Sequence, residues 1–247
     1  AIIYRMRLTK KATILGLGYV GTRIAAHLES IGYSIVGTTR SEKKIQSLKS
    51  KNWNILLWSK NTEFSNSYKV IAKELFLNSN VIISTIPPFP EINNNRQIID
   101  PVFLEFSRQL NNSKAWKAYI SSTSVYGGEN GDSFNEESST FPDTTRGKNR
   151  LEAEKYWIKS DAEIFRSAAI YGPGRSVISS LINKNAIPII KKGFKFNRIY
   201  IDDLVEIILV ALNKPRKKRI INLADGQPTE QINLWKEAKR ITGINIP

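Results

Sequence analysis

The chain has 247 residues, of which 41% are hydrophobic and 24% charged, so it can form one large globular domain, alone or with a small second lobe. It contains no cysteine, which excludes a disulfide framework, a thiolate metal site and a cysteine nucleophile. With a single histidine, His27, the sequence also gives no metal site to predict. The formal net charge of +15 would suit a nucleic acid, but the basic residues are spread along the chain without an RNA-recognition motif, which argues against that partner.

Short apolar segments rich in Ile and Val alternate with segments of helical periodicity, which predicts a parallel sheet with crossover helices. His27 falls at helical spacing beside apolar residues, so we expect an ordinary helix residue there. In chain order we expect strand 12–15, helix 22–30, strand 34–38, helix 42–51, strands 54–58 and 81–86, a helix around 101–110, strand 118–122, a loop at 129–145, helix 146–159, strand 163–166, a turn at YGPGRS, strand 198–201, helix 202–213, strand 220–223 and helix 231–242.

A glycine pattern, G-x-G-x-x-G, joins the first predicted strand to the first predicted helix in ATILGLGYVGTRIAAHL. Gly16 permits a tight turn, Gly18 lets the backbone approach a pyrophosphate, and Gly21 permits close packing of the helix on the strand. The N-terminus of the helix then faces the anion. The pattern in this context predicts a dinucleotide site, and we expect Tyr19 and Val20 to border it as well.

The end of the second predicted strand, in SIVGTTRSEKK, bears on the choice of dinucleotide. An NAD site usually carries Asp or Glu here for the ribose 2′-hydroxyl, but this chain has Thr39 followed by Arg40. A guanidinium suits a 2′-phosphate because it can donate two hydrogen bonds to it. We therefore expect NADP in preference to NAD, and the alternative is a solvent-exposed Arg40 at a strand end.

Three further motifs follow in order: YISSTSVYGG at 119–128, FRSAAIYGPGR at 165–175 and FNRIYIDDLVEIILVAL at 196–212. With the glycine pattern, they make the chain resemble the extended short-chain dehydrogenase/reductase superfamily, the NAD-dependent epimerase/dehydratase group. The resemblance implies an α/β fold: a Rossmann-type doubly wound parallel sheet with a small C-terminal substrate lobe. The Rossmann domain would span residues 6–170, with its sheet completed by about 198–223, and the lobe would comprise 171–197 and 224–247.

In that family the motif ending VYG carries a catalytic Ser or Thr four residues before its tyrosine, which here is Ser122 before Tyr126. The next family helix begins with Tyr-x-x-x-Lys, whose tyrosine transfers a proton and whose lysine binds the nicotinamide ribose. This chain has RGKNR there, and in this it is similar to the atypical YeeZ-like branch, which lacks the catalytic tyrosine. Arg146 cannot serve as an acid or base near neutral pH, whereas Arg150 could keep the lysine's contact with the ribose. A solvated first helical turn is the alternative for both arginines.

Further residues complete the expected site. Ser121 and Pro87 are expected to border the cofactor; Pro87 lies in STIPPFP, which replaces the family's His-x-Ala-Ala run, and a simple surface turn is the alternative there. Ala169 stands where nucleotide-sugar enzymes usually have an Asn near the substrate phosphates, but Arg175 is a candidate contact for an anionic substrate.

The missing proton donor must come from elsewhere if the protein is an enzyme. Tyr126 is our first choice because it is close to Ser122 in the sequence, and Tyr171 and Tyr200 are the other candidates. The alternative for all three tyrosines is that they pack in the interior with their hydroxyls bonded to the protein.

Two functions remain open on the sequence alone. The first is an NADP-dependent oxidoreductase or epimerase/dehydratase-like enzyme acting on an unidentified small molecule, for which an anion is one candidate. The second is a non-catalytic NADP-binding sensor or scaffold that meets RNA or an acidic partner through its basic surface.

The helices at 146–159 and around 101–110 are candidates for a homodimer interface, and no segment is long and apolar enough to predict a membrane span. The N-terminus shows no secretory signal, so we expect a cytoplasmic protein. Met6 is the only methionine, and whether translation starts there is left open by the sequence. The end at GINIP leaves the expected substrate lobe short of material.

Overall fold

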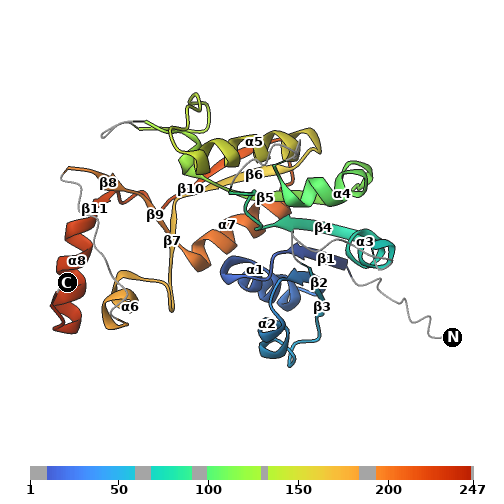
Figure 1. The fold of residues 1–247 in the computed structure, drawn as a ribbon, viewed down its shortest axis with the longest axis horizontal. Coiled ribbons are helices and arrows are strands. Elements are labelled where there is room, and N and C mark those ends of the chain that lie inside the picture. The colour runs from blue at the N-terminus through green and yellow to red at the C-terminus, as the bar shows by residue number, and fades with distance from the viewer. Residues whose placement is uncertain (1–9, 59–67, 91–98, 129–132, 184–192, 246–247) are drawn as a thin grey trace. The chain divides into compact units, whose positions relative to one another are not determined.

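The computed structural model describes residues 10–58, 68–90, 99–128, 133–183 and 193–245. Within these residues, seven strands form one sheet in the order β10-β6-β5-β4-β1-β2-β3 (Figure 1). The strands of this sheet are β1 (Lys10–Leu15), β2 (Tyr33–Thr39), β3 (Asn54–Leu57), β4 (Ser79–Ser84), β5 (Trp116–Ser122), β6 (Glu163–Ser167) and β10 (Ile220–Leu223). β1 pairs in parallel with β2 and β4, β2 with β3, and β4 with β5. The predicted doubly wound parallel sheet is confirmed, and its order reverses beside β1, where such folds bind their ligands.

Helices connect or follow these strands. They are α1 (Tyr19–Ser30), α2 (Glu42–Ser47), α3 (Tyr68–Phe76), α4 (Pro101–Asn112), α5 (Thr145–Lys159), α6 (Val177–Ile182), α7 (Ile201–Asn213) and α8 (Gln231–Thr242). The chain divides into two compact units: unit 1 comprises Ala1–Ile120, Glu152–Ile164 and Pro215–Arg219, and unit 2 comprises Ser121–Leu151, Phe165–Lys214 and Ile220–Pro247. The domain boundaries expected from the sequence stay a prediction.

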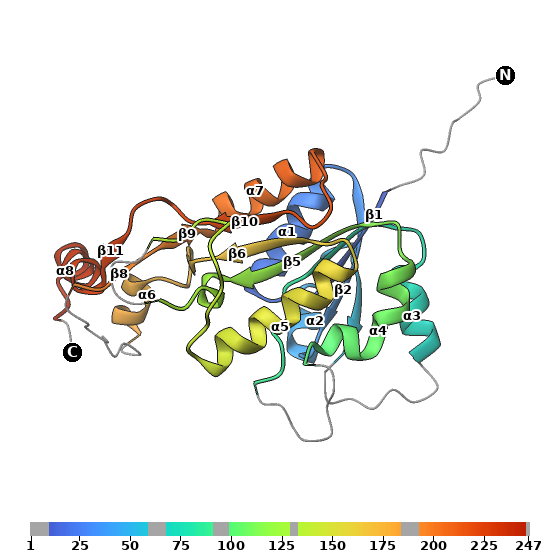
Figure 2. The ribbon, with the colours of Figure 1, turned by 90° about the horizontal axis from the view of Figure 1, so that it is seen from above.

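Unit 1 is built on strands that are buried on both faces. The last four residues of β1 and the last four of β4 are all buried, as expected of parallel strands covered by helices on each side. α1 packs against β1 and β2, and α3 and α4 lie side by side in both views (Figures 1 and 2). The turn between β1 and α1 is therefore held by an apolar core.

A buried carboxylate, Asp100, fixes the start of α4. Its Oδ1 accepts hydrogen bonds from the backbone N–H groups of Val102, at 2.9 Å, and Phe103, at 3.0 Å. Its Oδ2 accepts a third from the indole Nε1 of Trp157, at 3.0 Å. Asp100 is fully buried, so these donors replace the water that the carboxylate loses on folding. The same side chain thus caps α4 and fastens it to the C-terminal half of α5.

A second buried carboxylate, Glu163 at the start of β6, ties distant segments of unit 1 together. Its Oε1 accepts hydrogen bonds from Trp116 Nε1 and the backbone N–H of Arg216, each at 2.7 Å. Its Oε2 accepts from Arg219 Nε at 2.6 Å. The arrangement satisfies a fully buried charge with a guanidinium and two neutral donors, which is the condition for tolerating such a charge in a core.

Unit 2 adds a short helix and short strands, of which the sequence pattern predicted only the strand at 198–201. They are the 3-10 helix η1 (Thr123–Val125) and the strands β7 (Ala169–Tyr171), β8 (Lys195–Phe196), β9 (Arg198–Tyr200) and β11 (Thr229–Glu230). β7 pairs in parallel with β9, and β8 pairs antiparallel with β11. α6 and α8 lie side by side and bury Leu181, Trp235 and Ala238 between them (Figure 1).

Most predicted elements are present with shifted ends, and two helices were missed. The helix expected at 42–51 ends at Ser47, with Leu48 as its C-cap. The strand expected at 81–86 runs from Ser79 to Ser84, and beyond it the Thr85 hydroxyl bonds to the carbonyl oxygen of Gly16. Helices α3 and α6 were not predicted.

Two other expectations concern the membrane and the start of the chain. In the part of the chain that the structure describes, no helix has the length and hydropathy to cross a bilayer. The candidate start at Met6 lies outside the described residues.

Candidate functional site

The glycine turn between β1 and α1 is stabilised by threonines from the neighbouring strands. Gly16 has a φ of 99°, a left-handed conformation that glycine adopts without strain. Its N–H donates to Thr38 Oγ1 at 3.0 Å, and Thr85 Oγ1 donates to its carbonyl oxygen at 2.7 Å. The turn is thus held from β2 on one side and from the end of β4 on the other.

The other two glycines of the turn differ in what surrounds them. A Cβ added to Gly21 would overlap the carbonyl oxygen of Gly16, so only glycine lets α1 pack this closely on the turn. A Cβ added to Gly18 would meet no atom within 4 Å. Gly18 is also the N-cap of α1 and supplies no side-chain cap, which leaves the first N–H groups of the helix without a side-chain acceptor from that position. Open space above uncapped N–H groups fits the pyrophosphate of a dinucleotide.

Two of the predicted contacts, Tyr19 and Val20, begin α1. Val20 is buried, whereas the ring of Tyr19 is half-buried and lies 4.3 Å from the guanidinium of Arg23 on the next turn. Val20 therefore belongs to the packing of the helix, and Tyr19 is the more accessible of the two.

The end of β2 presents one buried and one exposed candidate for the adenosine ribose. Thr39 is 8% exposed, and its Oγ1 accepts a hydrogen bond from Ser41 N–H at 3.3 Å. Arg40 is exposed, which leaves its guanidinium accessible to an anion. Ser41 then caps α2 by accepting from Lys44 N–H.

The proline segment after β4 borders the glycine turn. Thr85 N–H donates to Leu15 O at 2.9 Å, and a Cβ on Gly16 would lie 2.9 Å from Ile86 Cγ1. Pro87, the next residue, is exposed, and Pro88 is buried. Pro87 thus follows directly on the two residues, Thr85 and Ile86, that contact the end of β1 and the glycine turn.

In unit 2, the end of β5 carries the predicted catalytic serine. Ser121 is buried and Ser122 is half-buried. Ser122 is the N-cap of η1, and its Oγ accepts a hydrogen bond from Ser124 N–H at 3.2 Å. This bond leaves the proton of the hydroxyl available as a donor.

Tyr126 lies in the interior of unit 2 and its hydroxyl is engaged. The residue is 3% exposed, and its hydroxyl donates to Asn222 Oδ1 at 2.7 Å. Phe134 stacks on its ring at 5.2 Å between centroids, and the guanidinium of Arg166 lies 4.8 Å from the ring centroid. For Tyr126 to serve a substrate, its hydroxyl would have to exchange Asn222 for that substrate.

The RGKNR segment begins α5, and its glycine has a structural reason. Thr144 accepts a hydrogen bond from Gly147 N–H at 3.0 Å, which caps the helix. A Cβ on Gly147 would overlap the carbonyl oxygen of Ser124 and lie 2.8 Å from Pro142 Cβ, so the absence of a side chain lets α5 start against the η1 turn. Arg146 is exposed and Arg150 is 8% exposed. The two arginines therefore lie in different surroundings, although four residues separate them.

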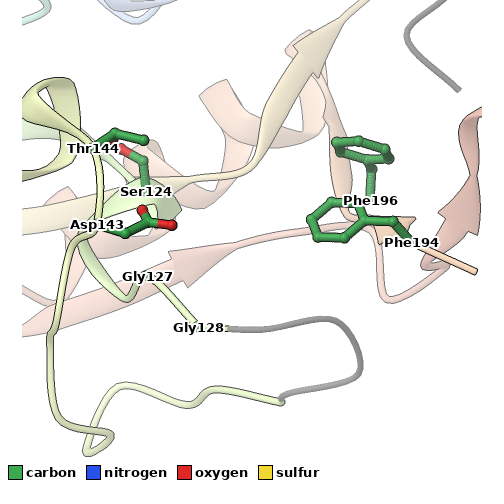
Figure 3. A pocket seen from close by; sticks show the side chains of 7 residues that line it. All are labelled: Ser124, Gly127, Gly128, Asp143, Thr144, Phe194 and Phe196. Carbon is green, nitrogen blue, oxygen red and sulfur yellow. The ribbon is translucent and has the colours of Figure 1, made fainter. Parts of the chain in front are cut away.

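A cavity of about 340 Å³ opens beside the η1 turn. It is lined by Ser124, Gly127, Gly128, Asp143, Thr144, Phe194 and Phe196, all in unit 2. Figure 3 shows Ser124, Asp143 and Thr144 together on one side and the two phenylalanine rings on the other. Sequence reasoning missed Asp143, Thr144, Phe194 and Phe196, because they are brought together from segments about 50 residues apart.

The remaining predicted residues lie after β6. Arg175 is exposed, and it pairs with Gly172 through backbone hydrogen bonds that close the YGPGR turn. Tyr171 and Tyr200, on the paired strands β7 and β9, are half-buried and meet edge to face at 5.4 Å. None of these three residues lines the cavity described above.

The sequence is similar to a family model and to a curated protein. The model of the NAD dependent epimerase/dehydratase family matches residues 12–224. Protein YeeZ of Escherichia coli K12 is 23% identical over 248 residues, which cover 96% of this chain and 86% of that protein.

Solved structures share the fold. A conserved protein of unknown function from Silicibacter pomeroyi DSS superposes with a TM-score of 0.81 at 25% identity, over 97% of this chain and 80% of that one. The UDP-glucuronic acid 4-epimerase of Bacillus cereus, solved in complex with NAD, has a TM-score of 0.74 at 19% identity, over 94% of this chain and 85% of that one. At this identity the epimerase is a guide to the fold alone.

Proposed function

The chain belongs to the NAD dependent epimerase/dehydratase family, and from this premise we propose that it is an NADP-dependent oxidoreductase or epimerase-like enzyme that acts on a small molecule. The glycine turn is the observation that carries the proposal. Open space at Gly18, the close approach of Gly21 to Gly16 and the left-handed Gly16 together fit a bound pyrophosphate. When bound, a nicotinamide dinucleotide supplies hydride transfer.

The preference for NADP rests on the end of β2. Arg40 is exposed there and can donate two hydrogen bonds to a 2′-phosphate, whereas Thr39 offers the ribose no carboxylate. The prediction that NADP is preferred to NAD follows from these two side chains.

On the substrate side, Ser122 and Tyr126 are the proposed catalytic residues. A half-buried Ser122 hydroxyl at the end of β5 can donate to a substrate oxygen. A proton must also be delivered when a carbonyl accepts a hydride. Arg146, which stands in the place of the family's tyrosine, holds its proton near neutral pH, so we assign this step to the Tyr126 hydroxyl after exchange of Asn222.

Four residues complete the proposed site. Ser121, beside Ser122, and Pro87, after β4, are proposed to border the dinucleotide, and the cationic Arg150 to contact its nicotinamide ribose. Arg175 is proposed to contact an anionic group of the substrate, because it is exposed in the YGPGR turn.

A second function, NADP binding without turnover, is favoured by one specific observation. Tyr126 is buried and bonded to Asn222, and the family's usual tyrosine position holds Arg146. A protein with this arrangement could bind the dinucleotide as a sensor or scaffold and have no proton donor ready for catalysis.

One experiment separates the two functions. The purified protein is incubated with NADPH and a panel of aldehydes and ketones, and the loss of reduced-nicotinamide absorbance is followed. We expect turnover with at least one carbonyl compound. If NADPH binds, as seen by nucleotide fluorescence, but no compound of the panel is turned over, the protein is a non-catalytic NADP-binding protein and the first function is wrong. If neither NADPH nor NADH binds, both functions are wrong.

A cytoplasmic location and a homodimer formed through α4 and α5 complete the proposal. Leu104 on α4 is 45% exposed, which leaves an apolar side chain for a second copy to cover. Light scattering on the purified chain should give twice the monomer mass, and a monomer at high protein concentration would refute the dimer.

A further inference from the structure

The cavity of unit 2 has two chemically different sides. One side carries the side chains of Phe194 and Phe196, whose ring centroids lie 4.6 Å apart at an interplanar angle of 65°. Phe196 is 37% exposed, so part of its ring faces water. A flat apolar group placed against these rings would remove that surface from water and add the offset or edge-to-face contacts that aromatic rings favour.

The opposite side is made of hydrogen-bond acceptors. Asp143 contributes an exposed carboxylate, and Figure 3 shows it beside Ser124. The Oγ of Ser124 is buried and has no hydrogen-bond partner among the residues that the structure describes. A buried hydroxyl without a partner is costly. Because that hydroxyl is buried, the exposed carboxylate of Asp143 is the acceptor that this side offers to a bound group.

The cavity is negatively charged, whereas the chain as a whole is positively charged. The protein has a net charge of +15, yet among the described residues that line the cavity the one charged side chain is the carboxylate of Asp143. A carboxylate repels a phosphate or a carboxylate and attracts a hydrogen-bond donor or a cation. The anion-binding groups proposed above, Arg40 and Arg175, are not part of this lining.

The polar side is held in position by the start of α5. Thr144 caps the helix through Gly147 N–H, and Gly147 lies against the carbonyl oxygen of Ser124. These contacts fix the segment that carries Asp143 next to the η1 turn. The backbone that carries the carboxylate is thus in place before a ligand binds, which lowers the entropy cost of binding.

We propose that this cavity binds an uncharged or cationic part of the substrate: an aromatic or otherwise planar apolar group that carries a hydroxyl or an ammonium. The planar group packs against Phe194 and Phe196, and its hydroxyl or ammonium donates to the carboxylate of Asp143. The assignment of the cavity as a substrate site rests on the proposed function. Binding in the cavity can nevertheless be measured without the dinucleotide.

Three small probes of matched size test the charge preference. The full chain, labelled with ¹⁵N, is titrated with benzylamine, benzyl alcohol and benzoate while its amide NMR spectrum is recorded. We expect benzylamine and benzyl alcohol to shift the amide signals of Gly127, Gly128 and Asp143, and benzoate to bind about 5- to 10-fold more weakly than benzylamine. Ethanolamine, which has the ammonium but no ring, should bind too weakly to saturate.

Variants with matched controls test the residues. Asp143→Asn should bring the affinities for benzylamine and benzoate to within about 2-fold of each other, because the charge that separates them is gone. Asp203→Asn, the same change at an exposed position on α7, should leave their ratio unchanged. Phe194→Ala and Phe196→Ala should each weaken benzylamine about 3- to 10-fold. Phe141→Ala, at a phenylalanine that is 76% exposed and outside the lining, should not.

Two results would overturn the assignment. Benzoate that binds as tightly as benzylamine would contradict the role of Asp143, as would an unchanged ratio in Asp143→Asn. Amide shifts that avoid the lining residues would place the probes elsewhere. Failure of the dinucleotide site is distinguishable, because Gly18→Val should abolish NADPH binding and leave benzylamine binding intact.

Discussion

Gly18 and Gly21 occupy one turn but perform different tasks. A side chain at Gly21 would collide with the backbone of Gly16, whereas one at Gly18 would enter open space. The φ of Gly18 is −83°, which residues with side chains also adopt. Gly21 therefore serves packing, whereas at Gly18 there is open space in which we propose that a ligand approaches the backbone.

Substitution of the two glycines should separate binding from stability. Gly18→Val should abolish NADPH binding, because the added methyl groups fill the space of the pyrophosphate, and should cost no more than about 1 kcal/mol of stability through the poorer N-cap. Gly21→Ala should lower the free energy of unfolding by about 1–3 kcal/mol through overpacking. Nucleotide fluorescence and thermal unfolding measure the two effects. An unchanged NADPH affinity in Gly18→Val would remove the dinucleotide assignment of the turn.

Arg40 determines the expected preference between the two dinucleotides. Arg40→Asp should weaken NADPH about 10- to 100-fold, because a charge-assisted pair with the 2′-phosphate becomes a repulsion. NADH affinity should change much less. Lys43→Asp makes a similar charge change at an exposed position three residues on and serves as the control. If Arg40→Asp lowers the affinities for NADPH and NADH by equal factors, Arg40 does not contact the 2′-phosphate.

Tyr126 can be tested once a carbonyl substrate is identified with NADPH. Tyr126→Phe removes the bond to Asn222 and should cost about 1 kcal/mol of stability whatever its function. As the proton donor it should also lower kcat by about 100-fold or more with little change in KM. Tyr171→Phe is the matched control. If Tyr126→Phe keeps its kcat, the tyrosine is a packing residue, and a loss in Tyr171→Phe would move the proton donor there.

At the scale of elements, the start of α5 joins two features that the sequence showed separately. Thr144 caps the helix, Gly147 allows it to approach Ser124, and the same turn carries Ser122. The glycine of RGKNR is thus required by the approach of α5 to the VYG motif.

The Gly147→Ala substitution tests this packing, because the sign of its effect on the free energy of unfolding depends on whether α5 contacts the η1 turn. In an unconstrained helix, replacing Gly by Ala stabilises by about 0.8–1 kcal/mol. Here the new Cβ would overlap Ser124 O, so we expect destabilisation by about 1–3 kcal/mol in urea unfolding. Lys148→Ala, at the exposed next position, should change stability by no more than about 0.5 kcal/mol. A stabilised Gly147→Ala protein would mean that α5 does not pack against the η1 turn.

Elements with strong local signals were predictable, and elements that depend on distant partners were not. The glycine turn and β1 could be placed because the motif and the apolar run are adjacent in sequence. α3 buries Ala72 and Leu75, which give a single turn of periodicity and too weak a pattern to detect. β7 and β8 have three and two residues, and each exists only through its pairing with β9 or β11.

At the scale of the whole molecule, the same distinction applies to the proposed dinucleotide residues and to the cavity of unit 2. The residues proposed to hold the dinucleotide at the glycine turn come from one strand–turn–helix segment and two neighbouring strands, so they could be proposed from the sequence. The cavity joins Asp143 to Phe194 and Phe196 across about 50 residues, and no motif connects them. Nor could the sequence show that Asn222 holds the hydroxyl of Tyr126, because 96 positions separate the two residues.

NADPH binding by the unmodified protein is the most direct test of the central claim that this chain uses its glycine turn for an NADP-type dinucleotide. The purified chain is titrated with NADPH and, separately, with NADH, and nucleotide fluorescence is followed to saturation. We expect one NADPH per chain, bound about 10-fold or more tightly than NADH. Saturable binding of neither nucleotide would contradict the claim.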